Sequence, residues 1–175
     1  LSYGMGKQKL TQSLGLSDIE AEELFSTYHS KVPFIRGLSN ACNRRASNKG
    51  YVTTLLGRKC RFNLYEPQDF KEVPLPYEQA VEKWGKEALN KLIQGSAADM
   101  TKKAMLDLWE EGFTPYVQIH DELDLGVSTQ KEIEQIKEIM ENCVKLQVPN
   151  IVDAEIGKTW GNATQSYTEV FNERH

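Results

Sequence analysis

A helical pattern of apolar and polar residues across positions 78–111 dominates this sequence. Gly85 and Gly95 interrupt the pattern, and Gly112 closes it, because glycine readily adopts the left-handed conformation that ends many helices. A loop with three prolines precedes it across residues 65–77. The pattern predicts helical structure over most of this stretch, weakened at the two glycines.

Two capping boxes predict further helices, one starting at Ser17 and one at Thr129, since each residue is followed three positions later by a glutamate. Pro33 favours a third helix, from residue 33 to about residue 48, which Gly50 ends. The helix after Thr129 should run to about residue 146. In the helix after Ser17, we expect four apolar side chains to face inward: Ile19, Leu24, Phe25 and Tyr28.

Short strands complete the pattern. Residues 51–56 and 59–64 predict a hairpin that turns at Gly57-Arg58, and residues 115–120 and 123–127 predict a second hairpin. A last strand is expected at residues 150–156. The order of elements predicts an α+β fold, in which helices pack on a small antiparallel sheet.

Composition excludes several classes of protein. The 175 residues suffice for about one domain, and 39% are hydrophobic, so the chain can form a core. No apolar run approaches the ~20 residues of a membrane-spanning helix, so no membrane partner is expected. Three cysteines without a CxxC pair favour a reducing compartment. Because the first residue is Leu1, we expect a processed chain, an excised one, or one piece of a longer protein.

Charge is distributed unevenly along the chain. Residues 30–65 contain eight basic residues and no acidic one, although the whole chain has a net charge of −4. This segment could be a solvated helix face whose counter-charges lie elsewhere in the fold. It could also be a surface that contacts the phosphate backbone of a nucleic acid.

The tripeptide His120-Asp121-Glu122 lies between two apolar segments. Carboxylates at a hairpin tip with buried flanks are costly to desolvate unless a cation lies nearby, and hard divalent cations bind carboxylate oxygens. The alternative interpretation is a polar hairpin turn.

Lys86, Asn90 and Gln94 are spaced four residues apart and therefore share one stripe of a helix. Long hydrogen-bonding side chains in such a row could follow a DNA minor groove, where every base pair presents acceptors. The alternative is a solvated helix face.

Four segments in this order resemble the C-terminal half of a family A DNA polymerase, in particular the bacteriophage members. They are residues 3–6 (YGMG), 50–59 (GYVTTLLGRK), 89–99 (LNKLIQGSAAD) and 117–123 (VQIHDEL). The resemblance covers the chain to about Trp160. It implies that residues 1–65 form the end of the fingers, with basic helices and a hairpin, and that residues 66–175 form the palm portion with the His-Asp-Glu hairpin.

The resemblance also implies roles for individual residues. Asp121 corresponds to a palm aspartate that binds two catalytic Mg²⁺ ions, and Glu122 to a lesser ligand beside it. The expected DNA-binding residues are Tyr3, Gly4, Arg58, Lys86, Asn90, Gln94 and His120. Of these, Tyr3 would stack near the templating base, and His120 would lie near the primer terminus. Lys86 occupies a position where the family usually has arginine.

The function implied is template-directed DNA synthesis by nucleotidyl transfer. Primer–template DNA and deoxynucleoside triphosphates are the expected partners, in the cytoplasm, or the host cytoplasm if the source is viral. The family's other metal-binding aspartate and its nucleotide-gripping residues would lie upstream of Leu1, so we expect this chain to need the N-terminal half of the polymerase and to be inactive alone. The alternatives are a catalytically silent DNA-binding module or accessory subunit, and a relative of single-subunit RNA polymerases.

Overall fold

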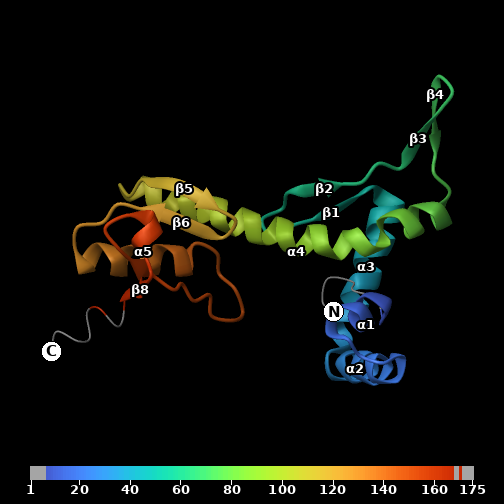
Figure 1. Cartoon of the computed structure of the whole chain (residues 1–175). Helices are drawn as coiled ribbons and strands as arrows, with labels where there is room; N and C mark the ends of the chain where they lie inside the picture. Colours follow the sequence, from blue (N-terminus) through green and yellow to red (C-terminus); the bar gives the residue numbers. More distant parts are fainter. Residues whose placement is uncertain (1–6, 168–169, 171–175) are drawn as a thin grey trace. The chain divides into compact units, whose positions relative to one another are not determined.

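A computed structural model of the chain describes residues 7–167 and 170, although the side chains of residues 7–10 and of Lys86 lie outside that description. The chain divides into two compact units, Leu1–Ser96 and Ala97–His175, and each is described here by itself. The long helix α4 (Tyr77–Glu110) contributes residues to both units (Figure 1).

Three helices begin the first unit: α1 (Lys7–Leu14), α2 (Asp18–Lys31) and α3 (Pro33–Lys49). The capping box predicted at Ser17 is present, because the Ser17 hydroxyl accepts from the Glu20 N–H while the Glu20 carboxylate accepts from the Ser17 N–H. Hydrogen bonds that the Ser17 hydroxyl and the Ser17 N–H donate to the Glu20 carboxylate hold the pKa of Glu20 below its ordinary value. Gly50 ends α3 in the left-handed conformation with φ 69°, as predicted.

The inward face predicted for α2 is wrong for two of its four residues. Ile19 and Leu24 are 75% and 41% exposed, whereas Phe25 and Tyr28 are half-buried and Ala21 is buried. Ala21, Phe25 and Tyr28 follow helical spacing along one side of α2, and Ile19 lies two residues before Ala21, near the opposite side. An apolar residue is buried only where another element covers it, which the sequence pattern does not reveal.

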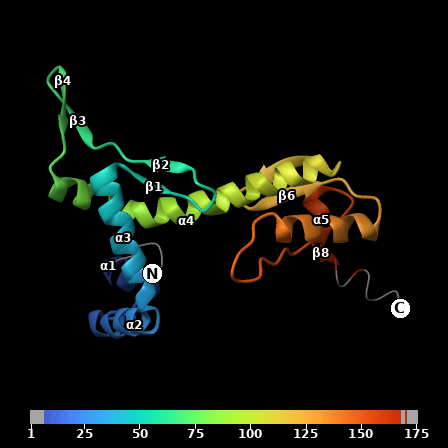
Figure 2. The same cartoon turned by 180° about the vertical axis from the view of Figure 1, so that it is seen from behind.

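The predicted first hairpin is present, with strands β1 (Tyr51–Thr53) and β2 (Lys59–Arg61) shorter than expected. It runs along α4 in both views of the chain (Figures 1 and 2). The core of this unit joins α3, the hairpin and the first half of α4. Its buried members are Cys42, Ala46, Val52, Phe62, Ala88 and Leu89.

The loop predicted across residues 65–77 is wrong in its first part, which forms a second hairpin of β3 (Tyr65–Gln68) and β4 (Lys71–Pro74). All eight strand residues are exposed, and the ribbon projects from the rest of its unit (Figure 2). Pro67 and Pro74 are compatible with a two-stranded ribbon, because each strand has one free edge where a missing N–H costs nothing. Proline content alone therefore did not distinguish a loop from an edge strand.

The helix α4 continues through both glycines that were expected to interrupt it. A Cβ atom on Gly85 would collide with the side-chain amide of Asn43, and one on Gly95 would lie 3.0 Å from Cγ2 of Thr54. The glycines are therefore explained by the close approach of α3 and of the β1–β2 hairpin to α4. Gly112 follows the helix with φ 88°, as the sequence predicted for its end.

The second unit contains the hairpin of β5 (Pro115–Ile119) and β6 (Glu122–Leu125) and the helix α5 (Gln130–Asn142), and both views show the hairpin beside α4 and α5 (Figures 1 and 2). Thr129 and Glu132 form the predicted capping box, and N–H donation from Ser128 and Thr129 lowers the pKa of Glu132. Buried apolar side chains come from α4 and α5: Ala104, Leu108, Ile133 and Ile136.

The strand predicted at residues 150–156 is reduced to β7 (Glu155–Ile156). It pairs with β8 (Gln165–Ser166), and a short 3₁₀ helix (Trp160–Asn162) lies between the two strands in sequence. Lys137 and Glu141 of α5 instead bind the backbone of Val152. The fold is α+β as predicted. Among the described residues, however, the strands form four separate two-stranded antiparallel ribbons and not one sheet.

Candidate functional site

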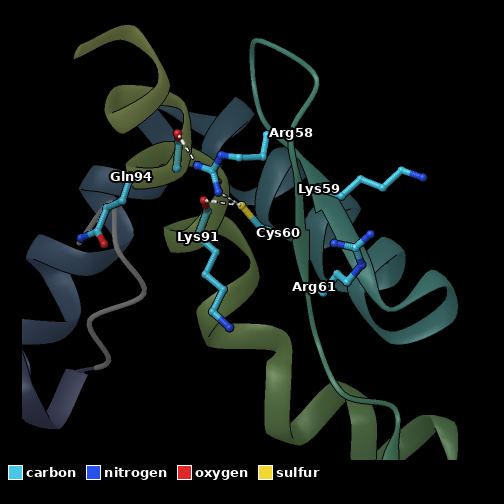
Figure 3. A pocket seen from close by; sticks show the side chains of 7 residues that line it. Arg58, Lys59, Cys60, Arg61, Lys91 and Gln94 are labelled. Atoms are coloured by element: carbon cyan, nitrogen blue, oxygen red, sulfur yellow. Dashed lines mark hydrogen bonds between the residues drawn. The ribbon is translucent and has the colours of Figure 1, made fainter. Parts of the chain in front are cut away.

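A pocket of about 530 Å³ lies in the first unit, between β2 and α4. It is lined by Arg58, Lys59, Cys60, Arg61, Lys91, Gln94 and Gly95 (Figure 3). Two of the predicted DNA-binding residues, Arg58 and Gln94, are thus brought together although they are distant in sequence. Four of the seven lining residues are cationic and none is acidic, so the pocket favours an anion.

Arg58 connects the hairpin to the helix. Its Nη2 donates a hydrogen bond of 2.9 Å to the backbone carbonyl of Gly95, and its Nη1 lies 3.7 Å from Sγ of Cys60. The Cys60 thiol lies 3.7 Å from the carbonyl of Lys91, one helical turn before Gly95 (Figure 3). These contacts require a bare backbone at Gly95, because an added Cβ would lie 3.1 Å from Sγ of Cys60. The walls of the pocket are therefore held together by Arg58 and Cys60.

The lysines of the pocket lie against aromatic rings. Nζ of Lys59 is 4.7 Å from the ring centroid of Tyr51, and Nζ of Lys91 is 4.5 Å from that of Phe62. A ring face attracts a cation but carries no net charge of its own, so neither ring offsets the charge of the lysine that lies against it. Lys91 also forms an exposed ion pair with Glu87 at 3.6 Å.

The eight cations of residues 30–65 are all exposed: Lys31, Arg36, Arg44, Arg45, Lys49, Arg58, Lys59 and Arg61. With Arg58 set aside, none of them forms an ion pair with another described residue. In the part of the chain that the structure describes, the charges of the other seven cations are therefore offset by no direct carboxylate partner. That arrangement favours a phosphate-contacting surface over the solvated-face alternative.

The predicted minor-groove stripe lies on α4. Gln94 is exposed at the pocket, whereas Asn90 is half-buried, and its Oδ1 has no hydrogen-bond donor among the described residues. The side chain of Lys86 is outside the described part, and so are Tyr3 and Gly4.

The carboxylate turn lies in the second unit, where His120 and Asp121 connect β5 to β6. His120 has φ 54°, a conformation that non-glycine residues adopt uncommonly, and its carbonyl accepts from Nε2 of Gln118 at 2.5 Å. Asp121 and Glu122 are both exposed, and Glu122 accepts a long hydrogen bond of 3.5 Å from Nε1 of Trp160. The three predicted residues are thus held together on one hairpin tip, which presents two carboxylates to solvent.

Sequence reasoning did not single out Lys59, Cys60, Arg61 or Lys91 as site residues. Lys59 and Arg61 were counted only as part of the basic segment. The residues of β2 alternate between exposed and half-buried. This alternation places Lys59 and Arg61 on one face of the strand and Cys60 on the other face, toward α4. Lys91 could have been found from its helical spacing of three residues from Gln94.

Comparison with known proteins identifies similar sequences and structures. The sequence model of DNA polymerase family A matches residues 1–162. The chain is 36% identical to a DNA-directed DNA polymerase of Pseudomonas phage M6, over 93% of this chain and 28% of the phage protein. It is 37% identical to DNA polymerase I of Geobacillus stearothermophilus, over 92% of this chain and 18% of that protein.

A solved structure shares the fold. The POL domain of Pol1 from M. smegmatis, in complex with DNA primer-template and dNTP, matches 94% of this chain and 29% of that chain with a TM-score of 0.77 and 31% identity. The chain therefore spans less than a third of the length of these relatives. Within the described residues, none of the helices combines the length and apolar character that crossing a membrane requires.

Proposed function

Because the chain belongs to DNA polymerase family A, we propose that it takes part in template-directed DNA synthesis by nucleotidyl transfer, as the C-terminal fragment or subunit of such a polymerase. Primer–template DNA, deoxynucleoside triphosphates and the N-terminal half of the polymerase are its proposed partners. The observation that carries this proposal is the family match over residues 1–162, which includes both the cationic pocket and the carboxylate turn. A protein with this function would work where its DNA is, in the cytoplasm or in the host cytoplasm if the source is viral.

The proposed division of labour follows the chain. Residues 1–65 would form the end of the fingers and residues 66–175 the palm portion. Arg58, Lys86, Asn90 and Gln94 would contact DNA in the first unit, as would Tyr3 and Gly4. The exposure of Gln94 supports groove contacts, because its side-chain amide can donate to the acceptors of the minor groove.

Asp121 and Glu122 would hold Mg²⁺, and His120 would lie near the primer end. Two exposed carboxylates on adjacent residues suit a hard divalent cation. Among the described residues, no group of three or more His, Cys, Asp or Glu side chains is arranged to hold an ion. The turn would therefore supply part of a ligand set that another carboxylate completes. Bound Mg²⁺ supplies activation of the primer 3′-hydroxyl and stabilisation of the leaving pyrophosphate.

This incomplete ligand set is the reason why we propose that the chain is inactive alone. The test is primer extension with the purified chain, with and without the upstream half of the polymerase. We expect no extension by the chain alone and extension when the two parts are combined. Extension by the chain alone would show that its active site is complete.

Two variations of this extension experiment separate the alternatives: one uses the variant Asp121→Asn, and the other supplies ribonucleotides. A catalytically silent DNA-binding module or accessory subunit would bind primer–template DNA, but Asp121→Asn would not affect synthesis by the combined parts. A relative of single-subunit RNA polymerases would incorporate ribonucleotides in place of deoxynucleotides.

A further inference from the structure

We infer that Trp160 is a positioning residue of the carboxylate turn. Its indole N–H orients the Glu122 carboxylate, and Tyr167 keeps Trp160 in place by anchoring β8 to α5. The inference rests on the proposed function, because it adds a residue to the proposed chemistry of Asp121 and Glu122. All four residues belong to the second unit.

The first argument concerns the two carboxylates of the turn. The Glu122 carboxylate accepts a long hydrogen bond of 3.5 Å from Nε1 of Trp160, and within the described part of the chain this is its single hydrogen-bond partner. The Asp121 carboxylate has no partner among the same residues. A long exposed side chain adopts many rotamers unless a fixed donor selects one of them. The indole therefore orients Glu122 and leaves Asp121 available to a metal ion.

The second argument concerns why a tryptophan lies at position 160. Its side chain is 62% exposed, so a role in the core does not account for it. The indole N–H is the only hydrogen-bond donor of a tryptophan side chain. At Trp160 this donor contacts a residue of the proposed metal site that lies 38 positions earlier in the sequence. The contact with Glu122 therefore explains an exposed tryptophan better than packing does.

The third argument concerns the rigidity of the segment that carries Trp160. The 3₁₀ helix Trp160–Asn162 is closed by a bond of 3.0 Å from the Asn162 N–H to the Thr159 carbonyl. Gly157 approaches this helix so closely that an added Cβ would collide with the backbone carbonyl of Asn162. The loop between β7 and β8 thus folds back on itself, which fixes the backbone from which the indole extends.

The fourth argument concerns the anchor of this loop. β8 lies beside α5 in both views of the chain (Figures 1 and 2). The Tyr167 hydroxyl, directly after β8, donates to the Glu134 carboxylate of α5 at 2.6 Å. Before β7, the Val152 N–H donates to the Glu141 carboxylate of α5 at 2.9 Å. The loop is therefore held to α5 at both ends. Tyr167 lies beyond residues 1–162, so the family match does not account for this anchor.

The indole N–H resonances of the full chain test the contact directly. The chain has three tryptophans, and a Trp→Phe variant of each assigns its signal. Glu122→Ala should shift the signal of Trp160. The signals of Trp84 and Trp109 should stay in place, since Trp84 donates to the backbone carbonyl of Asn63 and neither indole contacts Glu122. An unchanged Trp160 signal would overturn the inference.

Primer extension by the combined polymerase tests the positioning role. Trp160→Phe removes the donor and keeps an aromatic ring. It should slow single-turnover nucleotide addition by about two- to tenfold, the fold-change that corresponds to one hydrogen bond. Trp109→Phe is the matched control and should keep the wild-type rate, because Trp109 is 63% exposed on α4 and its indole has no hydrogen-bond partner among the described residues. Thermal unfolding of each variant checks that the fold is intact.

A Glu122→Ala background separates positioning from a general structural effect. If Trp160 acts through Glu122, Trp160→Phe should slow the reaction no further in this background, because both changes remove the same interaction. Equal slowing in both backgrounds would overturn the inference. A wild-type rate for Trp160→Phe, with extension abolished by Asp121→Asn, would also overturn it and leave the proposed function standing.

The anchor is tested with Tyr167→Phe, which removes the hydroxyl that binds Glu134 and should also slow nucleotide addition. Tyr116→Phe is the control, because Tyr116 is an exposed tyrosine of β5 whose hydroxyl has no hydrogen-bond partner in the described part of the chain. A wild-type rate for Tyr167→Phe would overturn the anchoring role. If Asp121→Asn does not reduce extension, the proposed metal site and the inference built on it are both wrong, whatever the indole signals show.

Discussion

The Nη2 atom of Arg58 lies 2.9 Å from the backbone carbonyl of Gly95, although the two residues are 37 positions apart in sequence. The bond connects the turn of the β1–β2 hairpin to the middle of α4. Leu55 adds a second connection, because its N–H donates to the Ser96 hydroxyl at 3.0 Å. Together these bonds place the cationic hairpin against the turn of α4 that carries Gln94.

Gly95→Ala should destabilise the chain despite the better helix propensity of alanine. The new Cβ would lie 3.0 to 3.2 Å from Thr54, Cys60 and Arg58, and overpacking of this kind costs about 1–3 kcal/mol. Gly37→Ala is the matched control, since Gly37 lies within α3 with nothing within 4 Å of an added Cβ. It should stabilise by up to about 1 kcal/mol. Urea unfolding of both variants measures the difference, and equal effects would contradict the close packing at Gly95.

Asp121→Asn should abolish nucleotide addition by the combined polymerase while DNA affinity stays within several-fold. A carboxylate that positions metal ions acts on the chemical step, whereas phosphate contacts elsewhere supply most of the binding. Asp69→Asn is a suitable control, because Asp69 is an exposed aspartate in the turn of the β3–β4 hairpin. Single-turnover extension and duplex binding are measured for both. A rate for Asp121→Asn above a tenth of the wild-type rate would remove Asp121 from the proposed metal site.

Gln94→Ala should reduce discrimination between matched and mismatched primer ends. A hydrogen bond from Gln94 to a minor-groove acceptor forms only on a pair of Watson–Crick width, so its loss should cost about 1–3 kcal/mol on matched ends. Mismatched ends never made the bond and should extend at the same rate. Lys102→Ala, at another exposed position of α4, should leave both rates unchanged. If the ratio of the two rates is the same for wild type and Gln94→Ala, the solvated-face interpretation is correct.

Glu132→Gln should alter how stability depends on pH. The Ser128 and Thr129 N–H groups lower the pKa of Glu132 below its ordinary value of 4.5 in the folded state. The ionised carboxylate therefore contributes stability that is complete above pH 4.5 and is lost as the pH falls through the lowered pKa. The difference in unfolding free energy between wild type and Glu132→Gln should shrink in this range.

Urea titrations between pH 7 and pH 3 test this expectation. Glu138→Gln, on the exposed side of α5, removes a glutamate that does not cap the helix and should follow the wild-type curve. A constant difference between wild type and Glu132→Gln across the whole range would show that the charge of the capping box contributes nothing.

Local signals in the sequence predicted a large part of this protein. The capping boxes at Ser17 and Thr129 and the helix end at Gly50 were found from a few adjacent residues. The hairpin turn predicted at Asp121-Glu122 is present one residue earlier, at His120-Asp121. Each depends on hydrogen bonds or backbone conformations within one turn of chain, so the residues concerned are close in sequence by necessity. The family, too, was recognised from four short segments, and the family match confirms it.

Tertiary structure decided what depends on a neighbour distant in sequence. Ile19 and Leu24 are exposed because the described neighbours of α2 leave both side chains uncovered. Gly85 and Gly95 are accommodated within α4 because Asn43 and the β1–β2 hairpin approach the bare backbone there. The cationic pocket arises in the same way, since Lys91 becomes a site residue only when β2 packs opposite it. Periodicity identifies which residues share a face of one element, but burial and site geometry are set by the element that packs against that face.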